Sequence, residues 1–181
     1  MPYQHAWYTP DVLSEKKFSQ LSKDVAKVCD YAQKQLKIKL YGAVDETDVP
    51  PAFTEDSFYF CGRQSTMTFG IHSHHGGLPE ENGLYFDYVE TNKEPFDIAV
   101  CMSLILLLYH FPECRLRSDG TVAEWSKAWK LVQYLFVDYN FLPYAPYATI
   151  DEMKAHYEKT KDKRFPKLIL EAWKNGQEFT T

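Results

Sequence analysis

Three histidines close together in the middle of the chain are the side chains best suited to metal chemistry. His72 and His74 are two residues apart, so on an extended strand both imidazoles would point to the same side. His75 follows them, and imidazole nitrogen is a common ligand of a divalent metal such as zinc. One hypothesis is therefore a metal-dependent hydrolase centred on these residues. The simpler interpretation is a polar loop before Gly76 and Gly77, because the chain has no HExxH or paired CxxC motif.

Carboxylates and thiols elsewhere could do acid–base or nucleophilic work. Asp97 opens an apolar stretch, but the dipole of a helix stabilises a carboxylate in its first turn without any catalytic role. Cys61 and His72 fall on one face of an expected hairpin, yet their offset along it separates them by roughly 13 Å. His110 and Cys114 form a second conceivable pair, for which a dipole-stabilised histidine at a helix end is the simpler account. Spacing alone therefore predicts no catalytic pair.

Negative charge is concentrated in the middle of the chain, whose net charge is −5. Residues 45–97 hold eleven acidic side chains and two basic ones, whereas the segments 14–39 and 154–174 are each net basic. An exposed acidic face would suit a basic macromolecular partner. Alternatively, the basic ends pack beside the acidic segment and the charges largely cancel. The predicted contact residues are Asp45, Glu46, Asp48, Glu80, Glu81 and Asp87.

A second candidate surface is the aromatic connection at residues 137–148. Aromatic side chains are enriched at the energetic centres of protein interfaces, and two prolines in this segment make burial of every ring difficult. The alternative is that the connection folds back and caps the core. The rings concerned are Tyr139, Phe141, Tyr144 and Tyr147.

Several other functions find little support in the sequence. There is no glycine-rich phosphate loop, and the lysines of the terminal segments are interspersed with acids, so nucleic-acid binding is possible but not favoured. The apolar stretch 98–111 is shorter than the about 20 residues that cross a bilayer, so no membrane partner is expected. Four cysteines without CxxC spacing, and an N-terminus unlike a secretion signal, predict reduced thiols in a cytoplasmic protein.

The elements that must position these side chains begin with a helix and continue with strands. Apolar residues repeat with helical spacing in the segment of about 12–38, which predicts an amphipathic helix. Alternating apolar residues predict a hairpin at 57–72, and pairing Phe60 with Phe69 places both apolar sets on one face. A third strand is expected at about 84–90.

Helices dominate the rest of the chain. The stretch 98–111 is apolar almost all round and predicts a helix buried on several sides. Residues 114–117 fit a short edge strand. Capping boxes at Thr121 and Thr149 mark the starts of later helices, and the last of these occupy about 149–175.

Together these patterns predict an α+β fold. A small antiparallel sheet, made of the hairpin and the third strand, packs on the buried apolar helix, with amphipathic helices at both ends. The chain is expected to be a single domain, 1–181, with its core at 57–136. The favoured function is non-enzymatic binding of a macromolecule, with a protein as the expected partner, a homodimer as one possibility and no cofactor. Its composition resembles that of inhibitor, immunity or antidefence proteins; the alternative is the metal-dependent hydrolase.

Overall fold

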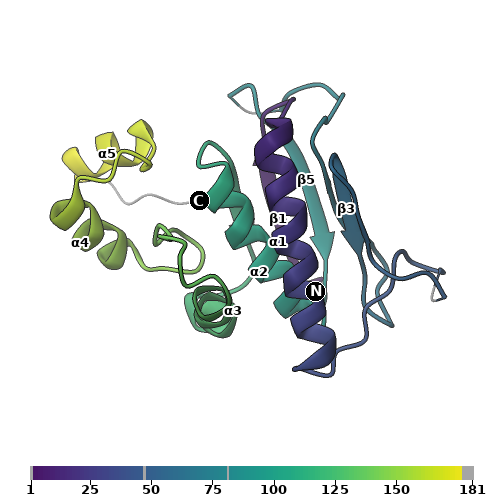
Figure 1. The fold of residues 1–181 in the computed structure, drawn as a ribbon. Helices are drawn as coiled ribbons and strands as arrows, with labels where there is room; N and C mark the ends of the chain where they lie inside the picture. The colour runs from purple at the N-terminus through teal and green to yellow at the C-terminus, as the bar shows by residue number, and fades with distance from the viewer. Residues whose placement is uncertain (1, 47, 81, 177–181) are drawn as a thin grey trace.

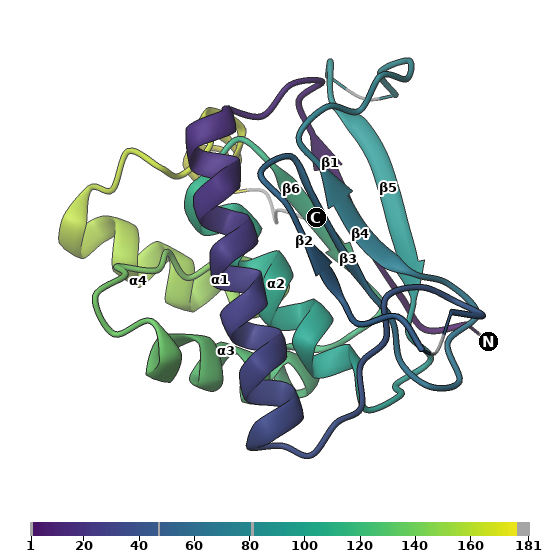
Figure 2. The same ribbon diagram turned by 45° about the vertical axis from the view of Figure 1, so that its right-hand side comes forward.

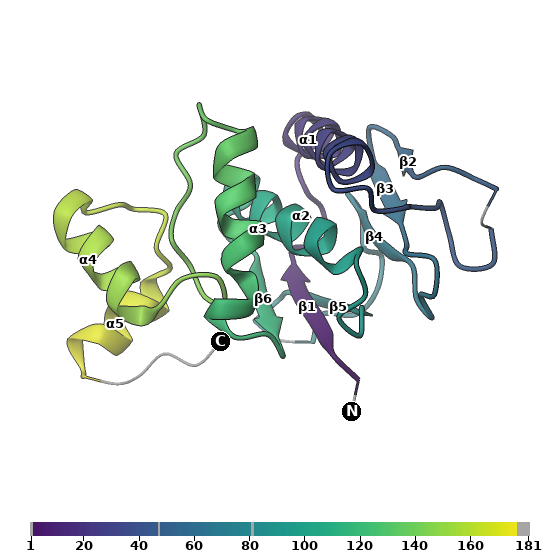
Figure 3. The ribbon, with the colours of Figure 1, turned by 90° about the horizontal axis from the view of Figure 1, so that it is seen from below.

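The centre of the fold is the apolar helix that the sequence predicts, α2 (Asp97–His110). Every residue of α2 from Ala99 to Leu108 is buried, as expected for a helix without a polar face. The computed structural model describes residues 2–46, 48–80 and 82–176, and in it α1 and α3 pack on α2 from two sides (Figure 3). Strands enclose α2 on the remaining side.

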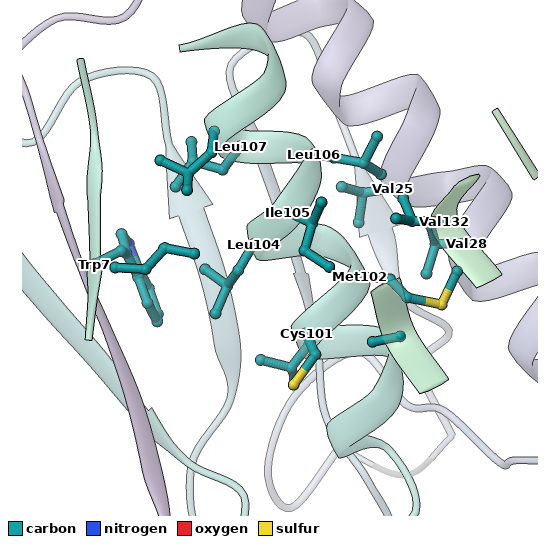
Figure 4. Packing of buried hydrophobic residues seen from close by; sticks show 14 of the residues in the cluster. Trp7, Val25, Val28, Cys101, Met102, Leu104, Ile105, Leu106, Leu107 and Val132 are labelled. Atoms are coloured by element: carbon teal, nitrogen blue, oxygen red, sulfur yellow. The ribbon is translucent and has the colours of Figure 1, made fainter. Parts of the chain in front are cut away.

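The side chains of α2 reach layers on both sides of the helix. Figure 4 shows Leu104 pointing toward Trp7 of a strand, whereas Leu106 points toward Val25 of α1 (Glu15–Lys34). Burial of each such side chain stabilises the folded state by roughly 1.5–3 kcal/mol. The predicted N-terminal helix is confirmed as α1, whose apolar stripe is fully buried and whose lysines lie on the exposed face.

One sheet is centred on a strand that the sequence did not predict, β1 (Gln4–Thr9). β1 pairs antiparallel with β5 (Tyr85–Glu90) on one side and with β6 (Arg115–Ser118) on the other. The third predicted strand is therefore present as β5, but it joins β1 instead of the hairpin. The predicted edge strand is present as β6.

The predicted hairpin forms the second sheet, with strand order β2-β3-β4. β2 (Ala52–Phe53) precedes the hairpin strands β3 (Ser57–Phe60) and β4 (Phe69–His72). The register pairs Phe60 with Phe69, as predicted, and buries the apolar residues of both strands, with β3 against α1. The α+β class is thus confirmed, with two three-stranded antiparallel sheets in place of one.

The remaining helices are α3 (Val122–Leu135), α4 (Ile150–Thr160) and α5 (Lys167–Lys174). Both predicted capping boxes are present, at Thr121 and Thr149. Figures 1 and 2 show α4 and α5 beyond α3, on the side of the molecule away from the strands. No helix among the described residues is long and apolar enough to cross a membrane.

Candidate functional site

The closest grouping of reactive side chains lies where the start of α2 meets β1. His5 comes from β1, whereas Asp97 and Cys101 lie one turn apart on α2. Their ligand atoms all lie within 4.8 Å of one another. Within residues 2–46, 48–80 and 82–176, this is the one group of three or more histidine, cysteine or acidic residues that converges so closely.

Strand alternation places His5 in this position. Successive side chains of β1 point to opposite faces, so His5 and Trp7 both point toward α2. The imidazole of His5 has no solvent exposure, and the ring of Trp125 from α3 packs edge-on against it at 5.1 Å between centroids. Both flanking strands and α3 therefore hold the histidine rigidly.

Asp97 accepts hydrogen bonds from several directions. The His5 Nε2 atom lies 2.8 Å from Asp97 Oδ1, and the hydroxyl of Thr91 donates to the same oxygen. The thiol of Cys101 is 3.7 Å from Asp97 Oδ2 and 3.6 Å from His5 Nε2. The carboxylate at the helix start is thus part of a side-chain network, beyond its ordinary interaction with the helix dipole.

The hydrogen bonds of Ser118 determine which His5 nitrogen carries the hydrogen. Ser118 Oγ accepts from Trp125 Nε1 at 2.9 Å and from the backbone N–H of Gly120 at 2.8 Å. Both lone pairs of the hydroxyl are then used, so its hydrogen donates to His5 Nδ1, 2.8 Å away. The ring hydrogen of a neutral His5 is consequently on Nε2, where it donates to Asp97 Oδ1. Moving that hydrogen to Nδ1 would displace one bond at Ser118, at a cost of about 1–3 kcal/mol.

This protonation pattern disfavours a cysteine nucleophile in the metal-free site. Burial, and then the charge of Asp97, raises the pKa of the Cys101 thiol well above its ordinary value. A reactive thiolate needs the opposite shift and a neighbouring base that accepts its proton. Here the thiol donates to Asp97, and the nearby His5 nitrogen already carries a hydrogen.

A cleft of about 480 Å³ opens beside Asp97 and Cys101. Its far wall includes Lys127 of α3, and an ion pair of 2.6 Å between Lys93 and Glu124 lies along it. Asp97 retains 21% of its side-chain exposure, whereas His5 lies behind it with none. A small ligand entering the cleft would therefore meet the carboxylate first.

The opposite face of β1 carries a second candidate surface. Ala6 and Tyr8 point away from α2, and the residues directly opposite them on β5 are Tyr88 and Phe86. The rings of Phe86 and Tyr88 are 5.8 Å apart between centroids, and Tyr8 packs 5.3 Å from Phe86. On β6, Arg117 donates to the hydroxyl of Tyr8.

We call Ala6, Tyr8, Phe86, Tyr88 and Arg117 the open sheet face. Its exposed side chains are Tyr88 and Arg117; Phe86 is half-buried, and Ala6 and Tyr8 are buried beneath their neighbours. In Figure 3 the helices α1, α2 and α3 lie on the other side of this sheet, and no helix of the described chain covers the open sheet face. A hollow of about 200 Å³ lies on it between Phe86 and Arg117. Sequence patterns did not indicate this surface because they did not reveal β1.

The three predicted metal ligands do not converge. His72 ends β4, His74 makes an isolated bridge to Val12, and the ring of His75 packs 4.8 Å from Tyr85. All three are exposed, and their nitrogens do not form a group of three ligand atoms. The convergence on which the metal hypothesis rested is therefore contradicted. These residues form a polar loop, because backbone and carboxylate oxygens of the segment preceding α1 bind its N–H groups.

The predicted acidic residues lie at two ends of the molecule. Asp45, Glu46 and Asp48 are exposed in the loop beside the tip of the β3–β4 hairpin, where Tyr41 pairs with Cys61. The other group belongs to the connection that leaves the opposite end of β4 and to β5, well separated from that loop in Figure 1. They do not share one face, because the length of the hairpin lies between them.

Of this second group, Glu80 is exposed and Glu81 lies outside the described residues. Asp87 caps the backbone N–H of Tyr88 at 2.8 Å on β5. Loss of solvent around its carboxyl group raises the pKa of Asp87, while the bond from Tyr88 and the nearby loop histidines act in the opposite direction. The side chain therefore has a structural role at the sheet edge.

The aromatic connection folds back over the core, as the alternative interpretation held. Phe141, Tyr144 and Tyr147 are buried, at 8%, 3% and 3% exposure. Tyr139 is half-buried, and its hydroxyl donates to Asp24 of α1 at 2.8 Å. The prediction that these rings form an exposed surface is wrong, because α2 and α3 present apolar side chains that the rings cover.

The same contact accounts for His110, whose Nε2 lies 2.6 Å from Asp24 Oδ2. Asp24 is almost fully buried and joins α1, α2 and the aromatic connection through these bonds. His110 is therefore bound to Asp24, and the conceivable pair with the fully buried Cys114 receives no support.

No protein-family model matches the chain, and no curated protein and no solved structure is significantly similar to it.

Proposed function

We propose that the protein acts without catalysis, by binding another protein through the open sheet face. The observation that carries this proposal is the pair of rings of Phe86 and Tyr88 on a sheet face without a covering helix. Tyr88 is 38% exposed. Aromatic and arginine side chains contribute most to the affinity of protein interfaces.

The charges near this surface favour a protein over a nucleic acid. One guanidinium nitrogen of Arg115, the other arginine of β6, already donates to three backbone carbonyls in residues 112–114. Acidic Glu90 and Asp119 border the same face, so few cations are present to neutralise phosphates. A partner with apolar side chains would suit the rings of Phe86 and Tyr88.

The partner is expected to contact the face of the sheet and not extend its edge. β5 is an edge strand, but Asp87 caps the N–H of Tyr88, one of the backbone groups that an added strand would need. Binding by strand addition would first have to displace that carboxylate. The exposed rings need no such rearrangement.

The composition suggested one kind of binding protein. In this form of the proposal, the protein blocks another protein, as an inhibitor, immunity or antidefence protein does. A cytoplasmic location is part of the same proposal. The four cysteines are free and buried, which suits a reducing compartment. The exposed loop with Asp45, Glu46 and Asp48 remains a second proposed contact, for a basic partner.

The test is affinity capture with the purified protein as bait in a lysate of its source, followed by identification and reconstitution of the captured protein. The double variant Phe86→Ala plus Tyr88→Ala should weaken binding of the reconstituted partner by about 30-fold or more, as for truncated interface anchors. The matched control is Tyr134→Ala, because Tyr134 of α3 is 68% exposed but distant in the fold from β5.

The double variant must keep the circular dichroism spectrum of the parent protein. If it does so and still binds with parental affinity, the open sheet face is not the contact. A charge-reversal variant of Asp45, Glu46 and Asp48 then tests the acidic loop. The molar mass from light scattering distinguishes a homodimer from a complex with a different protein.

A further inference from the structure

We propose that His5 Nε2, Asp97 Oδ2 and Cys101 Sγ bind one zinc ion whose fourth coordination position faces the cleft. This site lies on the face of β1 opposite to the open sheet face, so the inference goes beyond the proposed binding function and does not depend on it. It also differs from the predicted histidine cluster in every residue.

The distances between the three ligand atoms match a tetrahedral zinc site. Zinc lies at about 2.3 Å from thiolate sulfur and about 2.0–2.2 Å from imidazole nitrogen and carboxylate oxygen, so neighbouring ligand atoms are about 3.3–3.6 Å apart. The separation is 3.6 Å between His5 Nε2 and Cys101 Sγ and 3.7 Å between Cys101 Sγ and Asp97 Oδ2. Two edges of the tetrahedron are thus already near their final length.

The third edge needs a small change. His5 Nε2 is hydrogen-bonded to Asp97 Oδ1 at 2.8 Å, and a zinc ion would replace that hydrogen. Rotation of the Asp97 carboxyl group would present Oδ2 to the ion while Oδ1 keeps the hydrogen bond from Thr91. Such an outer hydrogen bond to a ligating carboxylate is typical of metal sites.

The charges of the site also suit a divalent cation. The carboxylate of Asp97 and the thiolate of Cys101 balance the two positive charges of zinc, so the occupied site is neutral, as burial requires. Binding releases the thiol proton of Cys101 to solvent. The ring hydrogen of His5 leaves Nε2, and Nδ1 gains a hydrogen that Ser118 Oγ accepts in place of its bond from Trp125 or Gly120. One proton is therefore released for each zinc ion bound. The zinc–imidazole bond must exceed the cost of the displaced hydrogen bond at Ser118.

The cleft beside Asp97 and Cys101 gives access to the site. His5 lies fully buried behind the other two ligands, whereas Asp97 and Cys101 line the cleft of about 480 Å³. Three protein ligands with an open fourth position are the arrangement in which zinc binds a water molecule or an exchangeable small ligand. The cleft lining carries both signs of charge, with Lys127 and Glu94 beside the ion pair of Lys93 and Glu124.

The alternative is a hydrogen-bond network that never holds a metal, and cobalt(II) distinguishes the two. The full-length protein is dialysed against a chelator and titrated with cobalt(II) alone, because a cobalt–thiolate bond produces a charge-transfer absorption in the near ultraviolet. We expect one equivalent to bind, zinc to displace it and zinc to raise the melting temperature. Calorimetry in two buffers of different ionisation enthalpy should give one proton released per zinc.

Cys101→Ala and Asp97→Asn should each weaken zinc binding by about 100-fold or more, whereas His75→Ala, a control in the exposed loop, should leave it unchanged. Cys114→Ala controls for loss of a buried thiol. Absence of the thiolate absorption in the parent protein, together with an unchanged melting temperature in zinc, overturns the proposal. So does cobalt absorption that persists in folded Cys101→Ala, or that is lost in His75→Ala. The measurements on the parent protein are sufficient to overturn the proposal, so the test remains valid if a variant folds poorly.

Discussion

Replacement of Asp24 by alanine should destabilise the protein far more than any exposed acidic substitution on the same helix. Asp24 accepts hydrogen bonds from His110 Nε2 at 2.6 Å, from the Tyr139 hydroxyl at 2.8 Å and from Gln20 at 3.0 Å. Only 7% of its side chain is exposed. The variant leaves donors from α2 and the aromatic connection facing a space that cannot supply the same charged acceptor.

The magnitude follows from the donors that lose their partner. Gln20 is exposed and can bond to water instead. His110 is 9% exposed and Tyr139 half-buried, and leaving each of these two donors without its acceptor costs about 1.5–2.5 kcal/mol, together about 3–5 kcal/mol. The higher helix propensity of alanine offsets about 0.5 kcal/mol of this loss in the free energy of unfolding. The net loss is about 2.5–4.5 kcal/mol, or about 5–18 °C in melting temperature for a chain of this size.

Urea denaturation followed by circular dichroism measures this loss, with Asp30→Ala as the matched control. Asp30 lies on the same helix and gains the same propensity, but it loses only an exposed bond to Lys34, worth about 0.3–0.5 kcal/mol. Hydrogen exchange should show faster opening of α1 and of the connection that carries Tyr139. A difference between the two variants smaller than about 1 kcal/mol would refute the idea that Asp24 joins these segments.

Three further predictions concern other parts of the chain. Hydrogen bonds from Arg164 hold the pKa of Asp162 well below its ordinary value, so Asp162 contributes to the free energy of unfolding above about pH 4, and this contribution is lost as pH falls further. Asp162→Asn should therefore be less stable than the parent protein near neutral pH, and the difference in urea denaturation should disappear at low pH. Gly120→Ala would place its methyl group 2.9 Å from Trp125 Nε1, so differential scanning calorimetry should show a loss of about 1–3 kcal/mol. The four buried thiols should react with a disulfide reagent only after unfolding, and a fast-reacting thiol in the native protein would contradict their burial.

Local chemistry explains which parts of the fold could be predicted. The hairpin register followed from alternation alone, because shifting the pairing of Phe60 and Phe69 by one residue would turn an apolar set toward solvent. The capping boxes at Thr121 and Thr149 depend on residues three apart in sequence. The apolar length of α2 required burial on several sides, and the structure provides it. Each of these signals lies within one element.

The missed features depend on contacts between distant segments. β1 pairs with strands more than 75 residues later in the chain. Residues on both of its faces are buried, so no alternation of polar and apolar residues marks it. Without β1, His5 was an ordinary residue near the N-terminus and Asp97 a residue explained by the helix dipole. The rings at 139–147 looked exposed because their prolines excluded a helix, yet irregular backbone can still cover a core.

The position of β1 links the two proposals. Its residues alternate between a face that supplies His5 to the cluster at α2 and a face that supplies Ala6 and Tyr8 to the open sheet face. Both candidate sites therefore depend on the same register, and a one-residue shift of β1 would turn His5 away from α2 and place Gln4 or Ala6 where His5 now lies. Binding at either face should consequently protect the backbone amides of β1 from hydrogen exchange, because a partner on one face stabilises the strand that carries the other. The two functions would then be coupled through the stability of β1 and not through direct contact between the sites.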